Sequence, residues 1–454
     1  MKLHPGLLIA SIVFAHLIQA PAQVTFAPAT NYPVGQQPDS VVAVNLGGHR
    51  GLDLVGANFF GTPWDATLTL LTNNGTGSFG SNTTLTVGAN PFSVMAVDVN
   101  GDGKVDLITA SSSANTLTVL TNNGDGVFGS NYTITLTGSF EAFTTADVNG
   151  DGKADLIYAD FVTNTLMVLT NNGSGGFVSN RTYSVGTSPD FVLAADLNGD
   201  GKVDLITAND GDNTLTILTN NGNGEFGSNA TLVVGEDPLS VVAADFDGDG
   251  KKDLACVNRF SDSLSVLINR GHGRFDSRTY SVGTNPYSLV AEDVNGDGKA
   301  DLICAHFTNP GMATVLINNG RGGFALATTL TVGRNSCQVI AADVNGDGRP
   351  DLITVNAGTN YLTDIGTISV LINNSVFPPA TSKPSLALKH SGNGLLVSWP
   401  SASAGWSLQQ NPDLTAPNWS PSGYSGCEIS DDGKNKSLAV GPPTGNLFFR
   451  LLHP

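Results

Sequence analysis

Segments of nine residues rich in aspartate recur along the chain and carry the side chains best suited to chemistry. In the segment from Asp98 to Asp106, oxygen-bearing side chains occupy positions 1, 3, 5 and 9, and glycine occupies position 6. Alternate residues of a tight loop turn their oxygens inward, the carbonyl of residue 7 adds another, and glycine permits the sharp bend. The pattern predicts a loop that binds a hard divalent cation, and calcium fits such an oxygen-only site.

The same segment begins again at Asp147, Asp196, Asp245, Asp293 and Asp343, at steps of 48 to 50 residues. Each copy offers side-chain oxygens from positions 1, 3, 5 and 9 and the backbone carbonyl of position 7. The predicted calcium ligands are therefore Asp98, Asn100, Asp102, Lys104, Asp106, Asp147, Asn149, Asp151, Lys153, Asp155, Asp196, Asn198, Asp200, Lys202, Asp204, Asp245, Asp247, Asp249, Lys251, Asp253, Asp293, Asn295, Asp297, Lys299, Asp301, Asp343, Asn345, Asp347, Arg349 and Asp351.

A turn without metal is the alternative for these loops, since Asp and Asn side chains accept hydrogen bonds from their own backbone amides. A bare turn, however, does not need three or four carboxylates that repel one another at close range. An EF-hand would add a bidentate Glu at position 12, where the first loop has Thr109. We therefore expect weaker binding, roughly in the micromolar-to-millimolar range of extracellular modules.

The segments that must position these loops recur with the same period and have β-strand patterns. The unit around Asp98 contains four such runs, at 93–97, 106–110, 115–120 and 128–136, and the third alternates apolar and polar residues. An Asn-Asn-Gly turn separates the third run from the fourth, which opens with Phe128. Four short antiparallel strands in about 49 residues match one blade of an all-β propeller, and we expect the recurring Phe to pack between blades.

The two ends of the repeat array complement each other. A decayed copy at Asn45 brings the number of units to seven, residues 24–34 resemble a fourth strand without the first three, and the last unit ends near Phe377 after three strands. We predict that the segment 24–34 completes the last blade by pairing beside 366–373. Such closure would remove an exposed sheet edge.

The repeat resembles the FG-GAP (VCBS-type) repeat, the unit of the seven-bladed propeller in integrin α subunits. The resemblance rests on Phe79-Gly80, on the pattern from Asp98 to Leu107 and on the segment 55–58, and it covers about residues 24–377. It implies a seven-bladed propeller with EF-hand-like calcium loops, but adhesion, lectin and enzyme-accessory roles all occur on this fold. The copy at Asn45 lacks the position-5 carboxylate and the position-6 glycine, so we expect no metal there.

Regions outside the repeats predict an exported protein with a second domain. Residues 1–22 combine Lys2, an apolar stretch and a small-residue cleavage site, as in a secretory signal peptide; an uncleaved anchor is the alternative. Residues 378–384 form a proline-rich linker, and 385–454 form a small C-terminal β-sandwich-like domain. The mature protein should be secreted, at the cell surface or in the periplasm, with no membrane span. Cys256 and Cys304 hold equivalent places in neighbouring repeats; we interpret them as small buried residues, and a disulfide between them is the alternative.

The charge balance and the absence of motifs exclude several functions. The formal net charge is −18, and the six loops hold 19 of the 39 acidic residues, so the acidity reflects metal demand. No basic face is available for nucleic acid. The chain has no Gly-x-Ser-x-Gly elbow, His-Glu-x-x-His or phosphate loop, and its seven histidines occupy unrelated repeat positions. No catalytic residue is assigned.

A partner would bind on the face opposite the calcium loops, where the repeats differ most. Two loop sets meet there: the residues that enter each first strand, and the loops that follow each second strand. The first set comprises Pro38-Asp39, Pro91-Phe92, Phe140-Glu141, Pro189-Asp190, Pro238-Leu239, Pro286-Tyr287 and Ser336-Cys337, and the second lies at 59–64, 160–161, 209–212, 259–260, 307–310 and 359–361. Aromatic rings beside amides and carboxylates suit a glycan or protein ligand; solvated loops and aromatics that plug the channel are the alternative.

Three functions follow from this face. The first is a non-catalytic binding or adhesion module with structural calcium. The second is a polysaccharide-active lyase or hydrolase, in which Glu141 and Asp190 would pair for acid–base work. The third is a structural component of the cell surface.

Overall fold

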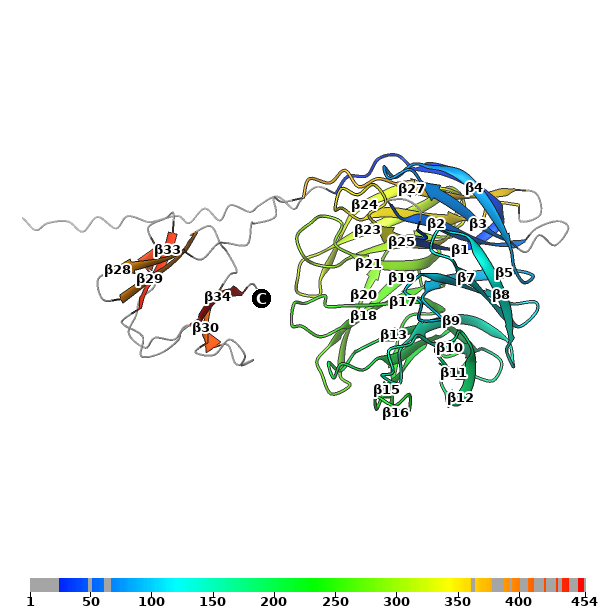
Figure 1. The fold of residues 1–454 in the computed structure, drawn as a ribbon, viewed down its shortest axis with the longest axis horizontal. Coiled ribbons are helices and arrows are strands. Elements are labelled where there is room, and N and C mark those ends of the chain that lie inside the picture. The colour runs from blue at the N-terminus through cyan, green and yellow to red at the C-terminus, as the bar shows by residue number, and fades with distance from the viewer. Residues whose placement is uncertain are drawn as a thin grey trace, which may run out of the picture.

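A computed structural model describes residues 24–47, 51–60, 67–360 and 364–377, and in the C-terminal part 387–391, 394–400, 407–411, 420–421, 430–431, 435–440 and 448–452 (Figure 1). The signal peptide at 1–22 and the linker at 378–384 lie outside the described residues and remain predictions. Within the described residues, no helix is long and apolar enough to cross a membrane.

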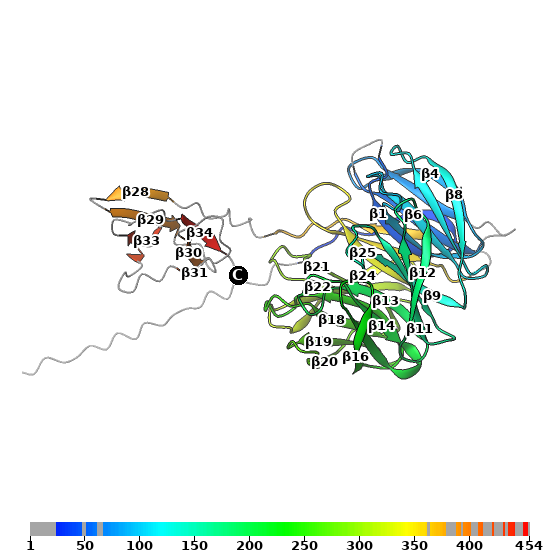
Figure 2. The same cartoon turned by 60° about the horizontal axis from the view of Figure 1, so that its bottom comes forward.

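The repeats fold into antiparallel sheets of four consecutive strands, arranged as a β-propeller (Figures 1 and 2). The first strands, which pair only with the second strands of their sheets, are β5 (Pro91–Val97), β9 (Phe140–Ala146), β13 (Pro189–Ala195), β17 (Pro238–Ala244), β21 (Pro286–Glu292) and β25 (Ser336–Ala342). The second strands are β2 (Asp53–Phe60), β6 (Asp106–Ser111), β10 (Asp155–Asp160), β14 (Asp204–Asn209), β18 (Asp253–Asn258), β22 (Asp301–His306) and β26 (Asp351–Asn356).

The outer strands follow the predicted hairpin turns. The third strands are β3 (Thr67–Asn73), β7 (Thr116–Asn122), β11 (Thr165–Asn171), β15 (Thr214–Asn220), β19 (Ser263–Asn269), β23 (Gly311–Asn318) and β27 (Ile365–Leu371). The fourth strands are β4 (Phe79–Thr86), β8 (Phe128–Thr135), β12 (Phe177–Ser184), β16 (Phe226–Val233), β20 (Phe275–Ser281) and β24 (Phe324–Val332). A 3-10 turn, η1 (Asp210–Asp212), follows β14.

The first strands lie side by side in a closed cycle. Each contacts the first strand of the next sheet, in the order β1, β5, β9, β13, β17, β21 and β25, and β25 contacts β1 (Thr30–Val44) again. The second strands are buried along their whole length from β6 to β26. The sheets therefore fan outward from a common centre.

Strand β1 pairs with a strand on each side, within a sheet of seven strands that joins the last repeat to the first. This pairing confirms the predicted closure. Its first part pairs with β27, with Thr30 opposite Val370 and Tyr32 opposite Ile368, and its second part pairs with β2. The pairing begins at Thr30 and not at Val24, although Phe26 makes an isolated bridge to Asn373. The strand also continues past residue 34, because β1 bends without a break: the register shifts on both sides of 36–38.

Glycine is required at the bend of β1. A Cβ on Gly35 would lie 2.4 Å from Cγ of Asn58, and the Gly35 amide donates to Oδ1 of Asn58 at 2.9 Å. The Val-Gly pair recurs before other first strands for the same reason: a Cβ on Gly186, Gly235 or Gly333 would meet the Asn at the end of the following second strand.

The hydrophobic core lies between neighbouring sheets. One cluster joins Val41 and Leu54 of the first repeat to Ile353 and Val355 of the last, so apolar packing also closes the ring. The phenylalanines after the hairpin turns pack between sheets, as predicted. The ring of Phe79 contacts Tyr32 of β1 at 5.3 Å, and that of Phe226 contacts Tyr183 of the preceding sheet at 5.2 Å.

The C-terminal part contains two further antiparallel sheets among its described residues. One comprises β28 (Ala387–Ser391), β29 (Gly394–Pro400), β33 (Asn435–Val440) and β32 (Ser430–Asp431), and the other comprises β31 (Ser420–Pro421), β30 (Ser407–Asn411) and β34 (Phe448–Leu452).

Candidate functional site

The predicted metal loops connect the first strand to the second in each sheet. In the loop at Asp98, the side chains of positions 1, 3 and 5 accept backbone hydrogen bonds from within the loop: Asp98 from Gly101 and Gly103 at 2.8 Å, Asn100 from Asp102 at 2.9 Å, and Asp102 from Lys104 at 2.9 Å. Gly103 has a φ of 82°, which an L residue rarely adopts. These bonds hold the oxygens around the loop, and Oδ1 of Asp98 accepts a second amide, that of Asp102, at 3.2 Å.

The position-9 aspartate has a structural role that the sequence pattern did not reveal. Asp106 is fully buried, and its two carboxylate oxygens accept the amides of Val99 at 3.2 Å and of Asn122 at 2.8 Å. The equivalent residues Asp155, Asp204, Asp253, Asp301 and Asp351 make the same pair of bonds. Burial raises the pKa of this carboxyl in all six loops, to about 7 for Asp301 and about 6 for Asp351, while the amide bonds oppose the increase.

The first repeat keeps this aspartate although it lacks the metal pattern. Asp53 stands at position 9 of the decayed copy, is 3% exposed and accepts the amide of Asn73 at 2.9 Å. Position 9 therefore braces the third strand against the loop whether or not a metal pattern is present.

Asparagines at the same position of each repeat join the metal loop of one sheet to the next sheet. Nδ2 of Asn122 donates to the carbonyl of Leu46, and Nδ2 of Asn171 donates to the carbonyl of Val99, which is position 2 of the preceding loop. The bond repeats from Asn220, Asn269, Asn318 and Asn373, and Asn73 closes the cycle on Val344 at 2.8 Å. The loops are thus locked into one hydrogen-bonded ring.

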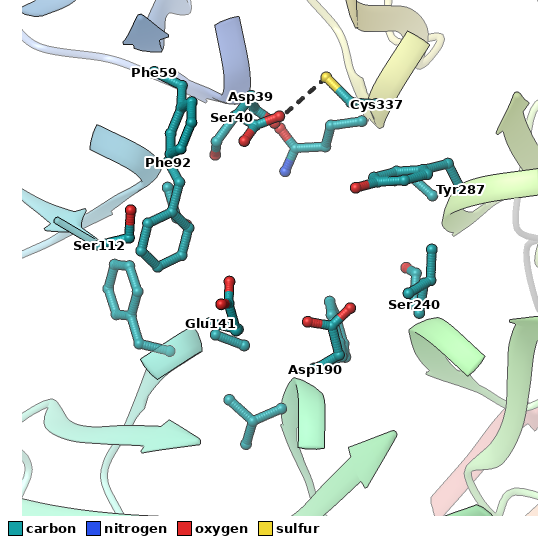
Figure 3. A pocket seen from close by; sticks show the side chains of 18 residues that line it. Asp39, Ser40, Phe59, Phe92, Ser112, Glu141, Asp190, Ser240, Tyr287 and Cys337 are labelled. Carbon is teal, nitrogen blue, oxygen red and sulfur yellow. Dashed lines mark hydrogen bonds between the residues drawn. The ribbon is translucent and has the colours of Figure 1, made fainter. Parts of the chain in front are cut away.

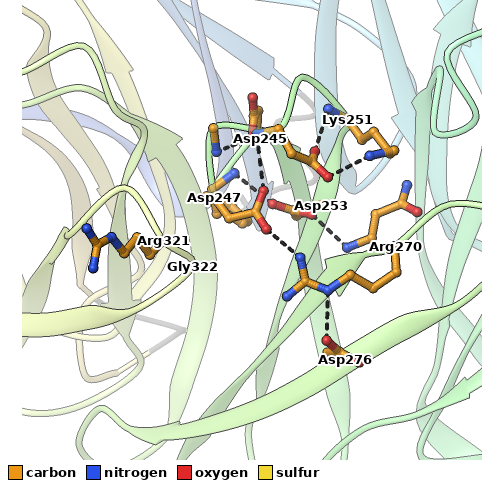
Figure 4. A network of polar contacts seen from close by, with 12 residues as sticks. Asp245, Asp247, Lys251, Asp253, Arg270, Asp276, Arg321 and Gly322 are labelled. Atoms are coloured by element: carbon orange, nitrogen blue, oxygen red, sulfur yellow. Dashed lines mark hydrogen bonds and ion pairs between the residues drawn. The ribbon is translucent and has the colours of Figure 1, made fainter. Parts of the chain in front are cut away.

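The loop at Asp245 brings three carboxylates closest together. One oxygen each from Asp245, Asp247 and Asp253 lies within 4.8 Å of the others, the one such acidic group in the described part of the chain, and it could hold a metal ion. Asp247 replaces the Asn of the other loops, and Arg270, which replaces an Asn of the hairpin turn, contacts it at 2.7 Å (Figure 4). The additional negative charge is therefore matched by an additional positive one.

In every loop the cation at position 7 also contacts the carboxylate at position 5. The distances range from 2.6 Å for Lys251–Asp249 to 3.8 Å for Lys202–Asp200. These side chains are exposed, so the pairs contribute little to stability. They do show that the position-5 oxygens point outward from the strands, where an ion could reach them.

A cavity of about 380 Å³ opens at the other end of the same strands, where the first strands begin (Figure 3). Residues that enter each first strand line it, as the sequence predicted. The seven equivalent lining residues are Asp39, Phe92, Glu141, Asp190, Leu239, Tyr287 and Cys337. The sequence placed Phe59 in a loop, but it lies near the end of β2 and also lines the cavity, as does Ser112, which directly follows β6.

Polar side chains of this cavity hold the first strands together. Oγ of Ser40 accepts the amide of Val94 on the next sheet at 3.3 Å, and Oγ of Ser288 accepts the amide of Val339 at 3.1 Å. Oε1 of Gln338 accepts the amide of Val41 at 2.5 Å, across the junction of the last and first repeats. Sequence reasoning missed these bonds, because a serine in a strand carries no sign of its partner.

The carboxyl groups of the cavity have pKa values above the ordinary range. Burial raises the pKa of Asp39 to about 6, with a hydrogen bond from Cys337 opposing. Burial, and then the charges of Glu141, Asp210 and Asp237, raise the pKa of Asp190 to about 6, while Arg259 opposes. Burial and the charge of Asp39 also raise the pKa of Glu141. The cavity is thus a region of negative charge without a basic residue in its described lining.

One arginine lies near the cavity without lining it. Arg259 follows β18, pairs with the buried carboxylate of Asp237, and stacks over Phe260 at 4.6 Å and Tyr287 at 5.9 Å. Because Arg259 is paired with Asp237, its charge compensates that of the cavity carboxylates only in part. The thiol of Cys337 donates to the carbonyl of Pro38 at 3.2 Å, and Cys256 and Cys304 are buried free thiols, as expected.

Comparison with known proteins identifies the repeat. The model of the FG-GAP-like repeat matches residues 48–109, 98–158, 147–207, 196–256, 245–304 and 293–354, which together span well over half of the chain. No curated protein is significantly similar to the chain in sequence.

Solved structures share the fold at low sequence identity. Two crystal structures of BBS1N in complex with ARL6DN, soaked with lead and with mercury, each align with a TM-score of 0.56 and 14% identity, over 79% of this chain and 99% of that chain. A 6-phosphogluconolactonase-like protein from Bacteroides uniformis aligns with a TM-score of 0.52 and 14% identity, over 66% of this chain and 86% of that one. Such likeness concerns the fold alone.

Proposed function

The chain belongs to the FG-GAP-like repeat family, and from that premise we propose that it is a secreted, calcium-stabilised propeller of seven blades. In this proposal it acts as a non-catalytic binding or adhesion module for a glycan or protein ligand, which enters the central cavity on the face opposite the calcium loops.

The cavity is the observation that carries the binding role. Most framework positions repeat from sheet to sheet, but the residue that enters the first strand is acidic in three repeats, aromatic in two, and Leu or Cys in the others. The framework residues are thus similar in all repeats, whereas the residues that line the central cavity differ from repeat to repeat. Such a varied lining is suited to recognise one particular ligand.

The strand order supports seven blades. The seven-stranded sheet is best counted as two blades that share β1, in addition to the five separate four-stranded sheets of the repeats. The closed cycle of first strands agrees with this count.

The loops fit calcium as a structural ion. Positions 1, 3 and 5 offer carboxylate and amide oxygens that the backbone already orients, and position 7 offers a carbonyl, a donor set suited to a hard cation. Bound calcium would neutralise the charge of the loops and hold each hairpin between its two strands. The signal-like segment at 1–22 supports export to a compartment where calcium is plentiful.

A binding screen with matched variants tests the proposal. The full chain, with calcium, is applied to a glycan array and to a panel of extracellular proteins, together with the double variant Glu141→Ala/Asp190→Ala. We expect a ligand of the unmodified chain to bind the cavity variant at least tenfold more weakly, because charge-assisted contacts contribute about 1.5–3 kcal/mol each. The control Glu225→Ala/Asp276→Ala removes two exposed carboxylates beside the outer strands and should bind normally.

Other outcomes of the screen would contradict this function. A ligand that binds the cavity variant and the unmodified chain equally would place the binding site elsewhere. Product release from polysaccharides that depends on Glu141 and Asp190 would instead favour the enzyme, and a chain without any ligand would favour a structural surface component.

A further inference from the structure

The lining of the central cavity is charged with one sign only. Three of its residues are acidic, Asp39, Glu141 and Asp190, and none of its described residues is basic. In Figure 3 these three side chains reach toward the hollow from different sides. A neutral or anionic ligand would leave this charge without a counterpart in a partly desolvated site.

The three carboxylates are too far apart to share a bare metal ion. Among the described residues, the group of acidic side chains with oxygens within 4.8 Å is the one at Asp245, and the cavity carboxylates do not form such a group. A larger cation, with its charge on one end of an organic molecule, fits a hollow of about 380 Å³ better.

The remaining walls are suited to an organic cation with hydroxyl groups. Phe59, Phe92, Phe143, Phe191 and Tyr287 provide aromatic rings, whose faces attract cations and cover apolar surface. The walls also include the serines Ser40, Ser93, Ser112, Ser240 and Ser288. A serine that accepts an amide hydrogen bond can still donate its own hydrogen.

We infer that the cavity selects a protonated amine, carried by an amino sugar of a glycan. This inference rests on the proposed binding function and narrows its ligand. The amine lies among the carboxylates, the sugar ring lies against the aromatic walls, and the sugar hydroxyls bond to the serines. A lysine side chain shares the amine but lacks the hydroxyls, so it uses only part of this lining.

Calorimetric titration of the full chain in calcium tests the inference with two matched probes. A tetramer of glucosamine and the same tetramer N-acetylated differ in the charge of the amine. We expect the charged tetramer to bind at pH 7.0 and the acetylated one to bind at least tenfold more weakly. The variant Asp39→Asn/Asp190→Asn keeps the size of both side chains and should lose at least tenfold in affinity per carboxylate for the charged tetramer.

The pH dependence provides an independent readout. The amine binds ionised carboxylates, and the pKa values of Asp39 and Asp190 near 6 mean that both are largely protonated at pH 5. Affinity for the charged tetramer should therefore fall at least tenfold from pH 7.0 to 5.0, and most of that dependence should be lost in the double Asn variant, in which Glu141 remains as a titrating carboxyl. The titratable and charged groups that face these two carboxyls are Glu141, Asp210, Asp237, Arg259, Tyr287 and Cys337.

The outcomes separate this inference from the function on which it rests. If both tetramers bind with equal affinity, or if the Asn variant keeps the affinity of the unmodified chain, recognition of the protonated amine is refuted. A cavity that binds glycans would still be consistent with that result. Binding of a lysine peptide in preference to glucosamine would refute the amino sugar. Absence of every cavity-dependent ligand would refute the proposed function itself. A melting temperature of the Asn variant at or above that of the unmodified chain shows that it is folded.

Discussion

Removal of calcium should lower the melting temperature of the chain by about 10 °C. An ion that binds only the folded state, at ten times its dissociation constant, contributes about 1.4 kcal/mol, so six independent loops contribute roughly 8 kcal/mol. Melting of about 350 residues has an entropy of roughly 0.7 kcal/mol per kelvin. Differential scanning calorimetry in calcium, and then in excess chelator, measures the difference.

The control for this experiment lies within the chain. Asp147→Ala removes the position-1 side chain of one loop and should reproduce about a sixth of the chelator effect. In chelator, Asp147→Ala and the unmodified chain should melt together. A melting curve that chelator does not change would mean that the loops are turns whose side chains serve only their own amides.

Asp53→Ala should lower the melting temperature by about 3 °C, equally in calcium and in chelator. The substitution removes a buried carboxylate and leaves the backbone amide of Asn73 without this acceptor, at about 1–3 kcal/mol. The first repeat lacks the metal pattern, so the loss should be independent of calcium. Thermal melting under both conditions checks the expectation.

Asp155→Ala is the informative partner of that variant. It loses the amide bonds of Val148 and Asn171 and also one predicted calcium ligand. The melting temperature of Asp155→Ala should fall in chelator, where only the amide bonds are lost, and its loss relative to the unmodified chain should be larger in calcium. If that loss is the same in calcium and in chelator, position 9 is a brace and not a ligand. The exposed Asp276→Ala should have little effect in either condition.

Much of the fold could be predicted from the sequence because its signals are local and repeated. The spacing of the aspartates, the Asn-Asn-Gly turns and the Phe that follows them recur in each unit, so each copy supports the interpretation of the others. The closure by the N-terminal strand followed from counting strands at the two ends. The continuity of β1 through residues 35–38 did not, because a bend at Gly35 depends on the distant Asn58.

The candidate site could be predicted only in part. Glu141 and Asp190 were expected near the channel because they occupy equivalent positions in the repeat, and both line the cavity. The brace at position 9 was missed because a buried acceptor of amides and a metal ligand have the same residue type. The ion pair between Arg259 and Asp237 could not be predicted, because it depends on the geometry of loops that differ between repeats.

The pairing of β1 with both β2 and β27 has a consequence for how the chain folds during synthesis. The amide of Thr25, just before β1, donates to Oγ of Ser375, 350 positions later, at 3.0 Å. A segment that is synthesised early therefore has its partner in one that is synthesised much later. Until the last repeat has been synthesised, the edge strands at both ends of the incomplete propeller lack partners and could pair with other chains. We therefore expect the ring to close late and cooperatively, and chains truncated before residue 365 to aggregate.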